Sequence, residues 1–171
     1  PLDKMTKLRP AFDKEGSITA ANASKINDGA AAMGVTSAEK AKSLGLKPMA
    51  KILGQASFAH EPDWFTTAPV EAAKKALNKA GLNASDIDRW EINEAFAVVT
   101  MASIRDLELD PEKVNVRGGA VSMGHPIGCS GARILVTLLH TLQAEGLRYG
   151  CASICIGGGE AAAVVVENLQ A

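Results

Sequence analysis

Two apolar segments near the C-terminus, residues 151–156 and 161–166, are separated by a short link that contains Gly157, Gly158 and Gly159. Each is short and apolar, which is typical of a buried strand. A parallel connection between neighbouring strands needs a crossover of roughly a dozen residues. The two segments must therefore form an antiparallel pair joined by a glycine-rich turn.

Upstream of this pair, segments with strand and helix character alternate along the chain. Strands are predicted over residues 30–35, 49–58 and 87–92, with another strand or turn at 114–116, and helices over 37–44, 69–80, 94–107 and 132–144. Such alternation is typical of an α/β fold, with a mixed, mostly parallel sheet and helices on both faces.

The composition excludes several classes of protein. The chain has 171 residues, of which 47% are hydrophobic and 22% charged, as in ordinary globular domains. Its net charge of −1 indicates neither a nucleic-acid nor a membrane-surface partner. No apolar run approaches the roughly 18 residues of a membrane span. The cysteines, Cys129, Cys151 and Cys155, are too few for a disulfide framework, so we expect a reducing, cytoplasmic location.

The N-terminal stretch is expected to belong to a different unit. The sequence starts at Pro1 rather than Met, and residues 1–35 offer only a loop and one strand, too little for a domain. We therefore expect the chain to be a fragment of a longer protein.

Asn93 lies where the predicted strand 87–92 ends and the next helix begins. Asparagine is among the best helix N-caps, so capping is one interpretation. The other is functional: the amide could orient a water or polarise a carbonyl. Strand ends in open α/β sheets face the ligand crevice.

His125 lies between Gly124 and Pro126, just before the predicted helix 132–144. The surrounding glycines allow backbone and ligand to approach closely. An imidazole there could stabilise an oxyanion or a thiolate, although a lone histidine is often only structural. His60 and His140 lack this context.

Cys155 ends the predicted strand 151–156 and precedes the three glycines. A free cysteine is often just a small buried hydrophobe, the interpretation we favour for Cys151. At a strand end, Cys155 is better placed for chemistry. A zinc site with both thiols is disfavoured, because two cysteines in one extended strand do not chelate the metal tetrahedrally. The glycines also lack the Gly-Lys-Ser/Thr ending of a phosphate loop.

Three blocks resemble the C-terminal signatures of the thiolase family: residues 93–97 (NEAFA), 119–128 (GAVSMGHPIG) and 155–159 (CIGGG). The resemblance extends to residues 22–31 and covers nearly the whole chain. It implies a βαβαβαββ half with a five-stranded sheet, formed by residues 43–171. Residues 1–42 would be the tail of the N-terminal half, ending in its last strand.

The resemblance also implies roles for individual residues. His125 would activate a nucleophilic thiol and donate to an oxyanion hole that Asn93 completes through a water. Cys155 would be the acid–base thiol, and the amide of Gly157 would serve a second oxyanion hole. Ser24, Phe12 and Phe96 would contact the pantetheine arm of coenzyme A.

Within the family, flanking residues are most similar to those of the acetoacetyl-CoA thiolases, which are acetyl-CoA acetyltransferases. This implies an acyltransferase of fatty acid metabolism that condenses two acetyl-CoA or cleaves acetoacetyl-CoA. The expected substrates are CoA thioesters, without cofactor or metal, and the expected assembly is a homodimer or homotetramer.

No block resembles the one that holds the family's nucleophilic cysteine, which lies in the N-terminal half. We therefore expect the chain to need that half as a partner and to be inactive alone. Two alternatives stay open: a 3-ketoacyl-CoA thiolase of broader specificity, and a non-catalytic half-domain that serves as a scaffold.

Overall fold

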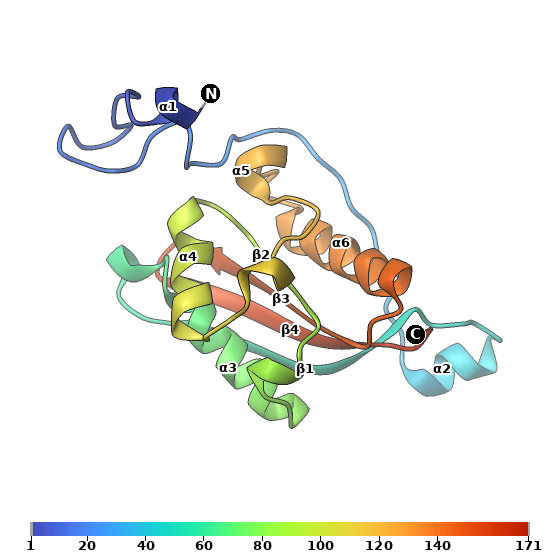
Figure 1. Ribbon diagram of the computed structural model, residues 1–171. Helices are drawn as coiled ribbons and strands as arrows, with labels where there is room; N and C mark the ends of the chain where they lie inside the picture. The colour runs from blue at the N-terminus through green and yellow to red at the C-terminus, as the bar shows by residue number, and fades with distance from the viewer. Residues whose placement is uncertain (1, 171) are drawn as a thin grey trace.

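The computed structural model describes residues 2–170, and a four-stranded sheet lies at its centre (Figure 1). The strands are β1 (Ala50–Ala59), β2 (Arg89–Ile92), β3 (Tyr149–Ile156) and β4 (Glu160–Asn168). Their order across the sheet is β1-β4-β3-β2. The predicted antiparallel pairing of the last two strands is confirmed, with Ile156 opposite Glu160 at the turn.

Helices cover both faces of the sheet, as the alternating pattern predicts. The α-helices are α1 (Leu2–Met5), α2 (Ala38–Ser43), α3 (Ala68–Ala80), α4 (Ala97–Asp106), α5 (Ala120–Met123) and α6 (Ser130–Glu145). Three 3-10 turns are η1 (Pro62–Trp64), η2 (Ala84–Asp86) and η3 (Pro111–Lys113).

Two apolar clusters show which helix covers which face. One joins α3 and α4 to Cys151 and Cys155, and the other joins α6 to Ala152 and Ile154. Successive residues of a strand point to opposite faces. The odd-numbered residues of β3 therefore face α3 and α4, and the even-numbered ones face α6. Figure 1 shows α6 on one side of the sheet and α3 and α4 on the other.

The expectation of a mostly parallel sheet is wrong in one respect. Only β2 and β3 pair in parallel, while β4 is antiparallel to both β1 and β3. β1, β2 and β3 do run in one direction, as their helical crossovers require. β4 folds back from β3 and lies between β3 and β1, so that two of the three pairings become antiparallel.

The described residues also contain four strands in this sheet rather than five. The predicted strand at 114–116 is reduced to one parallel bridge between Val114 and Trp90. Asn115 has φ +49°, a left-handed conformation that ends extended pairing. Its side chain replaces the strand backbone: Oδ1 accepts from the Ile92 amide at 2.8 Å, and Nδ2 donates to the Ile92 carbonyl at 2.8 Å.

The N-terminal segment passes along α5 and α6 before it reaches α2 (Figure 1). Residues 30–35, predicted as a strand, are irregular and mostly exposed. The apolar run lacks a neighbouring strand within residues 2–170, and a strand needs a partner for its backbone groups. Upstream of this run, the N-terminal segment pairs with the rest of the chain through isolated bridges at Ala23 and Ile26.

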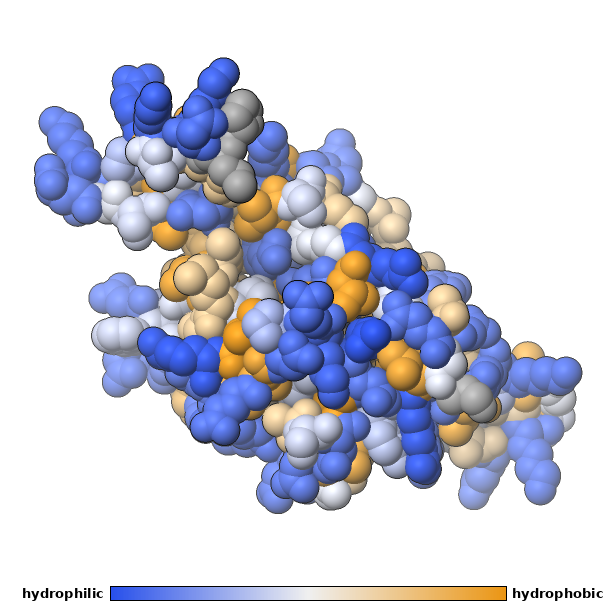
Figure 2. All heavy atoms as spheres, in the orientation of Figure 1, coloured by the Kyte–Doolittle hydropathy of each residue, from blue (hydrophilic) through white to orange (hydrophobic). Residues whose placement is uncertain are grey.

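Figure 2 shows hydrophobic residues in small separate groups among hydrophilic ones on the face in view. Among the described residues, no helix combines the length and the apolar character needed to cross a membrane.

Candidate active site

The site lies where β2 and β3 end side by side. Asn93 directly follows β2, and its amide donates to the Ser153 carbonyl at 2.9 Å. Cys155 is two residues further along β3 and points to the same face of the sheet as Ser153. Parallel pairing therefore brings two of the predicted site residues to one edge of the sheet.

Asn93 is not the N-cap of the following helix. α4 begins at Ala97 and its N-cap is Phe96, so residues 93–96 form a loop instead of the first helical turn. The side chain of Asn93 is fully buried, and its Oδ1 has no hydrogen-bond partner among the residues that the structure describes. A buried amide oxygen without a partner is costly, which argues against a purely structural role.

His125 completes this arrangement from the loop between α5 and α6. Its Nε2 lies 3.2 Å from Asn93 Nδ2, and its Nδ1 lies 2.6 Å from Ser130 Oγ. Gly124 makes the loop possible: it has φ +99°, and a Cβ there would lie 2.3 Å from Asn27 Oδ1. The two predicted residues Asn93 and His125 are thus in direct contact.

The N-terminal segment contacts both the loop that carries Asn93 and the loop that carries His125. Ala23 bridges to Phe96 and Ile26 bridges to His125, while the His125 amide donates to the Lys25 carbonyl at 2.8 Å. Ser24 Oγ donates to the Ala95 carbonyl at 2.9 Å. The predicted CoA contact Ser24 therefore lies beside the loop that carries Asn93.

Aromatic rings gather around the same loop. Phe12 and Phe96 meet edge to face with ring centroids 5.8 Å apart. Phe65, which the sequence analysis did not single out, packs against Phe96 at 6.1 Å. Phe12 is 76% exposed and Phe96 is half-buried, so the cluster forms a partly exposed apolar surface beside the loop that carries Asn93.

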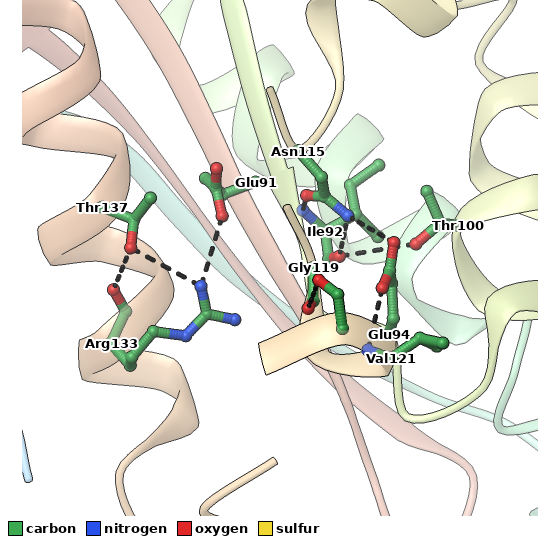
Figure 3. A network of polar contacts seen from close by, with 10 residues as sticks. Glu91, Ile92, Glu94, Thr100, Asn115, Gly119, Val121, Arg133 and Thr137 are labelled. Carbon is green, nitrogen blue, oxygen red and sulfur yellow. Dashed lines mark hydrogen bonds and ion pairs between the residues drawn. The ribbon is translucent and has the colours of Figure 1, made fainter. Parts of the chain in front are cut away.

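Glu94 is a structural anchor that the sequence analysis missed. Its carboxylate accepts from the Val121 amide at 3.0 Å and from Asn115 Nδ2 at 3.2 Å (Figure 3). A Cβ added to Gly119 would lie 2.1 Å from the Glu94 carboxyl carbon. The carboxylate therefore holds α5 against the end of β2, and this approach requires glycine at position 119.

A buried ion pair between Glu91 and Arg133 was also missed. Glu91 is 2% exposed, and its Oε2 lies 3.6 Å from Arg133 Nη1 (Figure 3). Arg133 also lies 3.5 Å from Thr137 Oγ1 on α6. Burial raises the pKa of Glu91 to about 7, although Arg133 opposes that rise. The only sequence signal was a charged residue in an apolar strand.

The thiols differ in burial and in acidity. Burial raises the pKa of Cys155 to about 11, and it raises the pKa of the fully buried Cys151 further. Cys155 is therefore a protonated thiol at neutral pH, suited to exchanging protons rather than to standing as a thiolate. Cys129 is half-buried beside Gly29.

Burial, with the nearby charge of Arg133, lowers the pKa of His125 below its usual range. A neutral imidazole can accept a proton, so His125 is suited to act as a base near neutral pH. Gly157 is exposed in the turn after Cys155, and a Cβ there would meet no atom of residues 2–170 within 4 Å. Its amide lies at the same end of β3 as the thiol.

No group of three or more His, Cys, Asp or Glu side chains within residues 2–170 is arranged to hold a metal ion. The arrangement instead places a side-chain amide in contact with a neutral imidazole, and a protonated thiol at the end of the neighbouring strand.

Two models of known protein families match the chain. The family description "Thiolase, C-terminal domain" matches residues 46–168, and "Thiolase, N-terminal domain" matches residues 1–39. The chain belongs to the thiolase family.

Individual thiolases are similar to this chain over nearly its whole length. It is 58% identical to acetyl-CoA acetyltransferase 1 of Arabidopsis thaliana, over 98% of the chain and 40% of the relative. It is 51% identical to a cytosolic acetyl-CoA acetyltransferase of Gibberella zeae, over 99% of the chain and 43% of the relative. The chain thus spans less than half the length of these thiolases.

Solved thiolase structures have the same fold. The Bacillus anthracis acetyl-CoA acetyltransferase superposes with a TM-score of 0.91 at 45% identity, over 99% of this chain and 43% of that one. A human mitochondrial 3-ketoacyl-CoA thiolase in complex with CoA superposes with a TM-score of 0.89 at 40% identity, over 98% of this chain and 43% of that one. The α/β thiolase half predicted for the chain is confirmed.

Proposed function

We propose that this thiolase chain is the C-terminal part of an acetyl-CoA acetyltransferase, which condenses two acetyl-CoA to acetoacetyl-CoA and CoA or catalyses the reverse thiolysis. The observation that carries the proposal is the contact between Asn93 and His125, together with the protonated thiol of Cys155 at the end of the strand that pairs with β2. The identity of 50–58% to relatives named acetyl-CoA acetyltransferases supports the choice of substrate.

The proposed reaction assigns the proton transfers to His125 and Cys155. His125 Nε2 takes the proton of a nucleophilic thiol, and the resulting thiolate attacks the acyl carbon. The bond from that carbon to the CoA sulfur breaks, and Cys155 gives its proton to the departing CoA thiolate. Cys155, now a thiolate, removes a proton from the methyl group of the second acetyl-CoA. The enolate attacks the acyl carbon of the acyl-enzyme, and the released nucleophilic thiolate takes its proton back from His125; thiolysis runs through the same steps in reverse. Donors aimed at the enolate oxygen, from His125 and from Asn93 through a water, stabilise the charge that develops.

The oxyanion of the acyl-transfer step would be held by the exposed amide of Gly157. The pantetheine arm of CoA would lie against Phe12 and Phe96, whose rings are in contact, and near Ser24. No metal or other cofactor is needed for this sequence of proton transfers and acyl transfers.

The proposed enzyme needs a second half. We assign residues 43–171 to the C-terminal domain and residues 1–42 to the end of the N-terminal half, which the two family matches support. The N-terminal half would supply the nucleophilic cysteine, and the complete enzyme would be a homodimer or homotetramer. We place it in the cytoplasm, in agreement with the cytosolic Gibberella zeae relative.

A second candidate is a 3-ketoacyl-CoA thiolase of broader specificity. The similarity to the human mitochondrial 3-ketoacyl-CoA thiolase, at 39% identity and a TM-score of 0.89, favours it. Both candidates use the same proton chemistry and differ in the acyl chain that they accept. A non-catalytic scaffold is the remaining alternative.

A chimera tests these candidates. The segment of Arabidopsis thaliana acetyl-CoA acetyltransferase 1 that matches this chain is replaced by residues 1–171, and thiolysis is measured with acetoacetyl-CoA and with longer 3-ketoacyl-CoA substrates. We expect activity with acetoacetyl-CoA that is lost in a His125→Ala chimera. Preference for longer substrates would favour the second candidate, and a folded but inactive chimera would favour the scaffold.

The 171-residue chain expressed alone provides the matching control. We expect it to catalyse no thiolysis, because it contains no block that resembles the family's nucleophilic cysteine. Thiolysis of acetoacetyl-CoA by this chain alone would contradict the assignment of the nucleophile to another segment.

A further inference from the structure

Ser130 contacts the imidazole of His125 on the side away from Asn93. It is the first residue of α6 and is fully buried. Its Oγ lies 2.6 Å from His125 Nδ1 and 3.0 Å from the Pro126 carbonyl oxygen. These two contacts determine which ring nitrogen of the histidine carries the proton.

The hydroxyl of Ser130 has one proton to donate, and a carbonyl oxygen can only accept. Ser130 Oγ therefore donates to the Pro126 carbonyl and accepts from His125 Nδ1–H. If the hydroxyl donated to Nδ1 instead, two oxygen lone pairs would face each other at 3.0 Å without a proton between them. The contacts of Ser130 thus favour the Nδ1–H tautomer of the neutral imidazole.

The opposite nitrogen supports the same assignment. Asn93 Nδ2 lies 3.2 Å from Nε2, and an amide nitrogen can only donate. In the Nδ1–H tautomer, Nε2 has a lone pair that accepts this bond. A continuous series of hydrogen bonds then runs from the Asn93 amide through His125 and Ser130 to the carbonyl of Pro126.

We propose that Ser130 is a positioning residue that fixes the Nδ1–H tautomer of His125, so that Nε2 points into the site as a proton acceptor. Its role in catalysis rests on the proposed function, but the tautomer does not. When a thiol S–H bond breaks and its proton forms a bond to Nε2, the hydrogen bond from Asn93 Nδ2 to Nε2 breaks, because that nitrogen has a single lone pair, and the ring becomes an imidazolium. Nδ1–H still donates to Ser130, and this bond strengthens because its donor is now charged.

Nitrogen NMR of the 171-residue chain tests the tautomer without any need for activity. His60→Gln and His140→Gln leave His125 as the only imidazole, and long-range proton–nitrogen correlations distinguish a protonated from an unprotonated ring nitrogen. We expect Nδ1 to carry the proton above the pKa of the ring, and Ser130→Ala to shift the population toward Nε2–H, the form that free histidine prefers. An Nε2–H wild type, or a Ser130→Ala spectrum unchanged from wild type, would overturn the proposal.

Kinetics of the chimera test the consequence. Ser130→Ala is expected to lower kcat/KM roughly tenfold to a hundredfold, the loss typical of one hydrogen bond to a charged group. Ser130→Thr retains the hydroxyl and is expected to recover both the tautomer and most of the activity. Full activity of the Ser130→Ala chimera would overturn the positioning role.

Ser103 provides a matched control. It is 1% exposed, and its Oγ donates to the Val99 carbonyl at 3.0 Å, four residues earlier in α4, as Ser130 Oγ donates to Pro126. Ser103→Ala removes a similar buried bond far from the imidazole and should leave the His125 tautomer unchanged. An equal tautomer shift in both alanine variants would reduce Ser130 to a structural residue and overturn the proposal.

The two proposals can fail separately. An inactive wild-type chimera with an Nδ1–H imidazole would contradict the proposed function and leave the tautomer assignment standing. An active chimera with an Nε2–H imidazole would support the enzyme and overturn the role of Ser130.

Discussion

The side-chain amide of Asn93 meets the imidazole of His125 at 3.2 Å between Nδ2 and Nε2, although the two residues belong to different motifs. The parallel pairing of β2 with β3 sets the position of Asn93, and the loop before α6 sets that of His125. The contact therefore depends on how β2, β3 and α6 pack together.

Asn93→Ala in the chimera should lower kcat/KM for acetoacetyl-CoA roughly a hundredfold to a thousandfold, the loss typical of one oxyanion-hole donor. Asn78→Ala on the exposed side of α3 is the control and should leave kcat/KM unchanged. Equal activity of the two variants would contradict a catalytic role for Asn93.

Glu91 should make stability depend on pH. Its carboxyl pKa rises from 4.5 in the unfolded chain to about 7 in the folded one. Between these values the folded state binds more protons, so the free energy of unfolding falls as pH rises. Glu91→Gln removes this dependence. As pH rises from 4.5 to about 7, the free energy of unfolding of the variant should increase by roughly 3 kcal/mol relative to that of wild type.

Urea unfolding at several pH values, on both sides of the window, measures this difference. Glu71→Gln is the control, because its side chain is 44% exposed and forms only a surface pair with Lys74. A wild-type stability that rises across the window would mean that Glu91 is ionised in the folded protein at acid pH, contrary to the expectation.

The three thiols should react with iodoacetamide in a set order. Cys129, half-buried, should be alkylated first, and the fully buried Cys151 last. Cys155 should react slowly at neutral pH and faster as pH rises toward its pKa of about 11, because only the thiolate attacks. Mass spectrometry of peptides from the folded chain measures each rate.

Alkylation of the chain unfolded in urea provides the control, where the three thiols should react at similar rates. Labelling of Cys155 as fast as Cys129 at neutral pH would indicate an accessible thiol of ordinary acidity and would contradict its burial.

Gly119→Ala should destabilise the fold, because the new Cβ would lie 2.1 Å from the Glu94 carboxyl carbon. Displacing this carboxylate also weakens its bonds to Val121 and Asn115. We expect a loss of about 1–3 kcal/mol in the free energy of unfolding, as for other overpacked sites.

Gly128→Ala is the matched control, since its Cβ would meet no atom within 4 Å in the described part of the chain. The substitution Gly119→Ala should also cost less in a Glu94→Ala background, where the carboxylate no longer occupies the space. An equal cost in both backgrounds would show that Glu94 is not the cause.

Much of the candidate site was predictable because its residues lie at local sequence signals. Asn93 follows an apolar strand, His125 lies among glycines, and Cys155 ends another strand before a turn. The residues that support them carry no such signal. Ser130 is an ordinary small residue at a helix start, and Arg133 is one charged residue in a helix.

The sequence by itself determined the strands β1 to β4, the helices α3, α4 and α6, and the antiparallel turn between β3 and β4. Those features depend on apolar periodicity and on glycines, which act over a few residues. Only the tertiary structure decided that β4 lies between β1 and β3, and that Asn115 ends a fifth strand after one bridge. It also decided that Ser130 and Asn93 hold opposite sides of one imidazole, because contacts between distant segments depend on how the elements pack and not on local propensity.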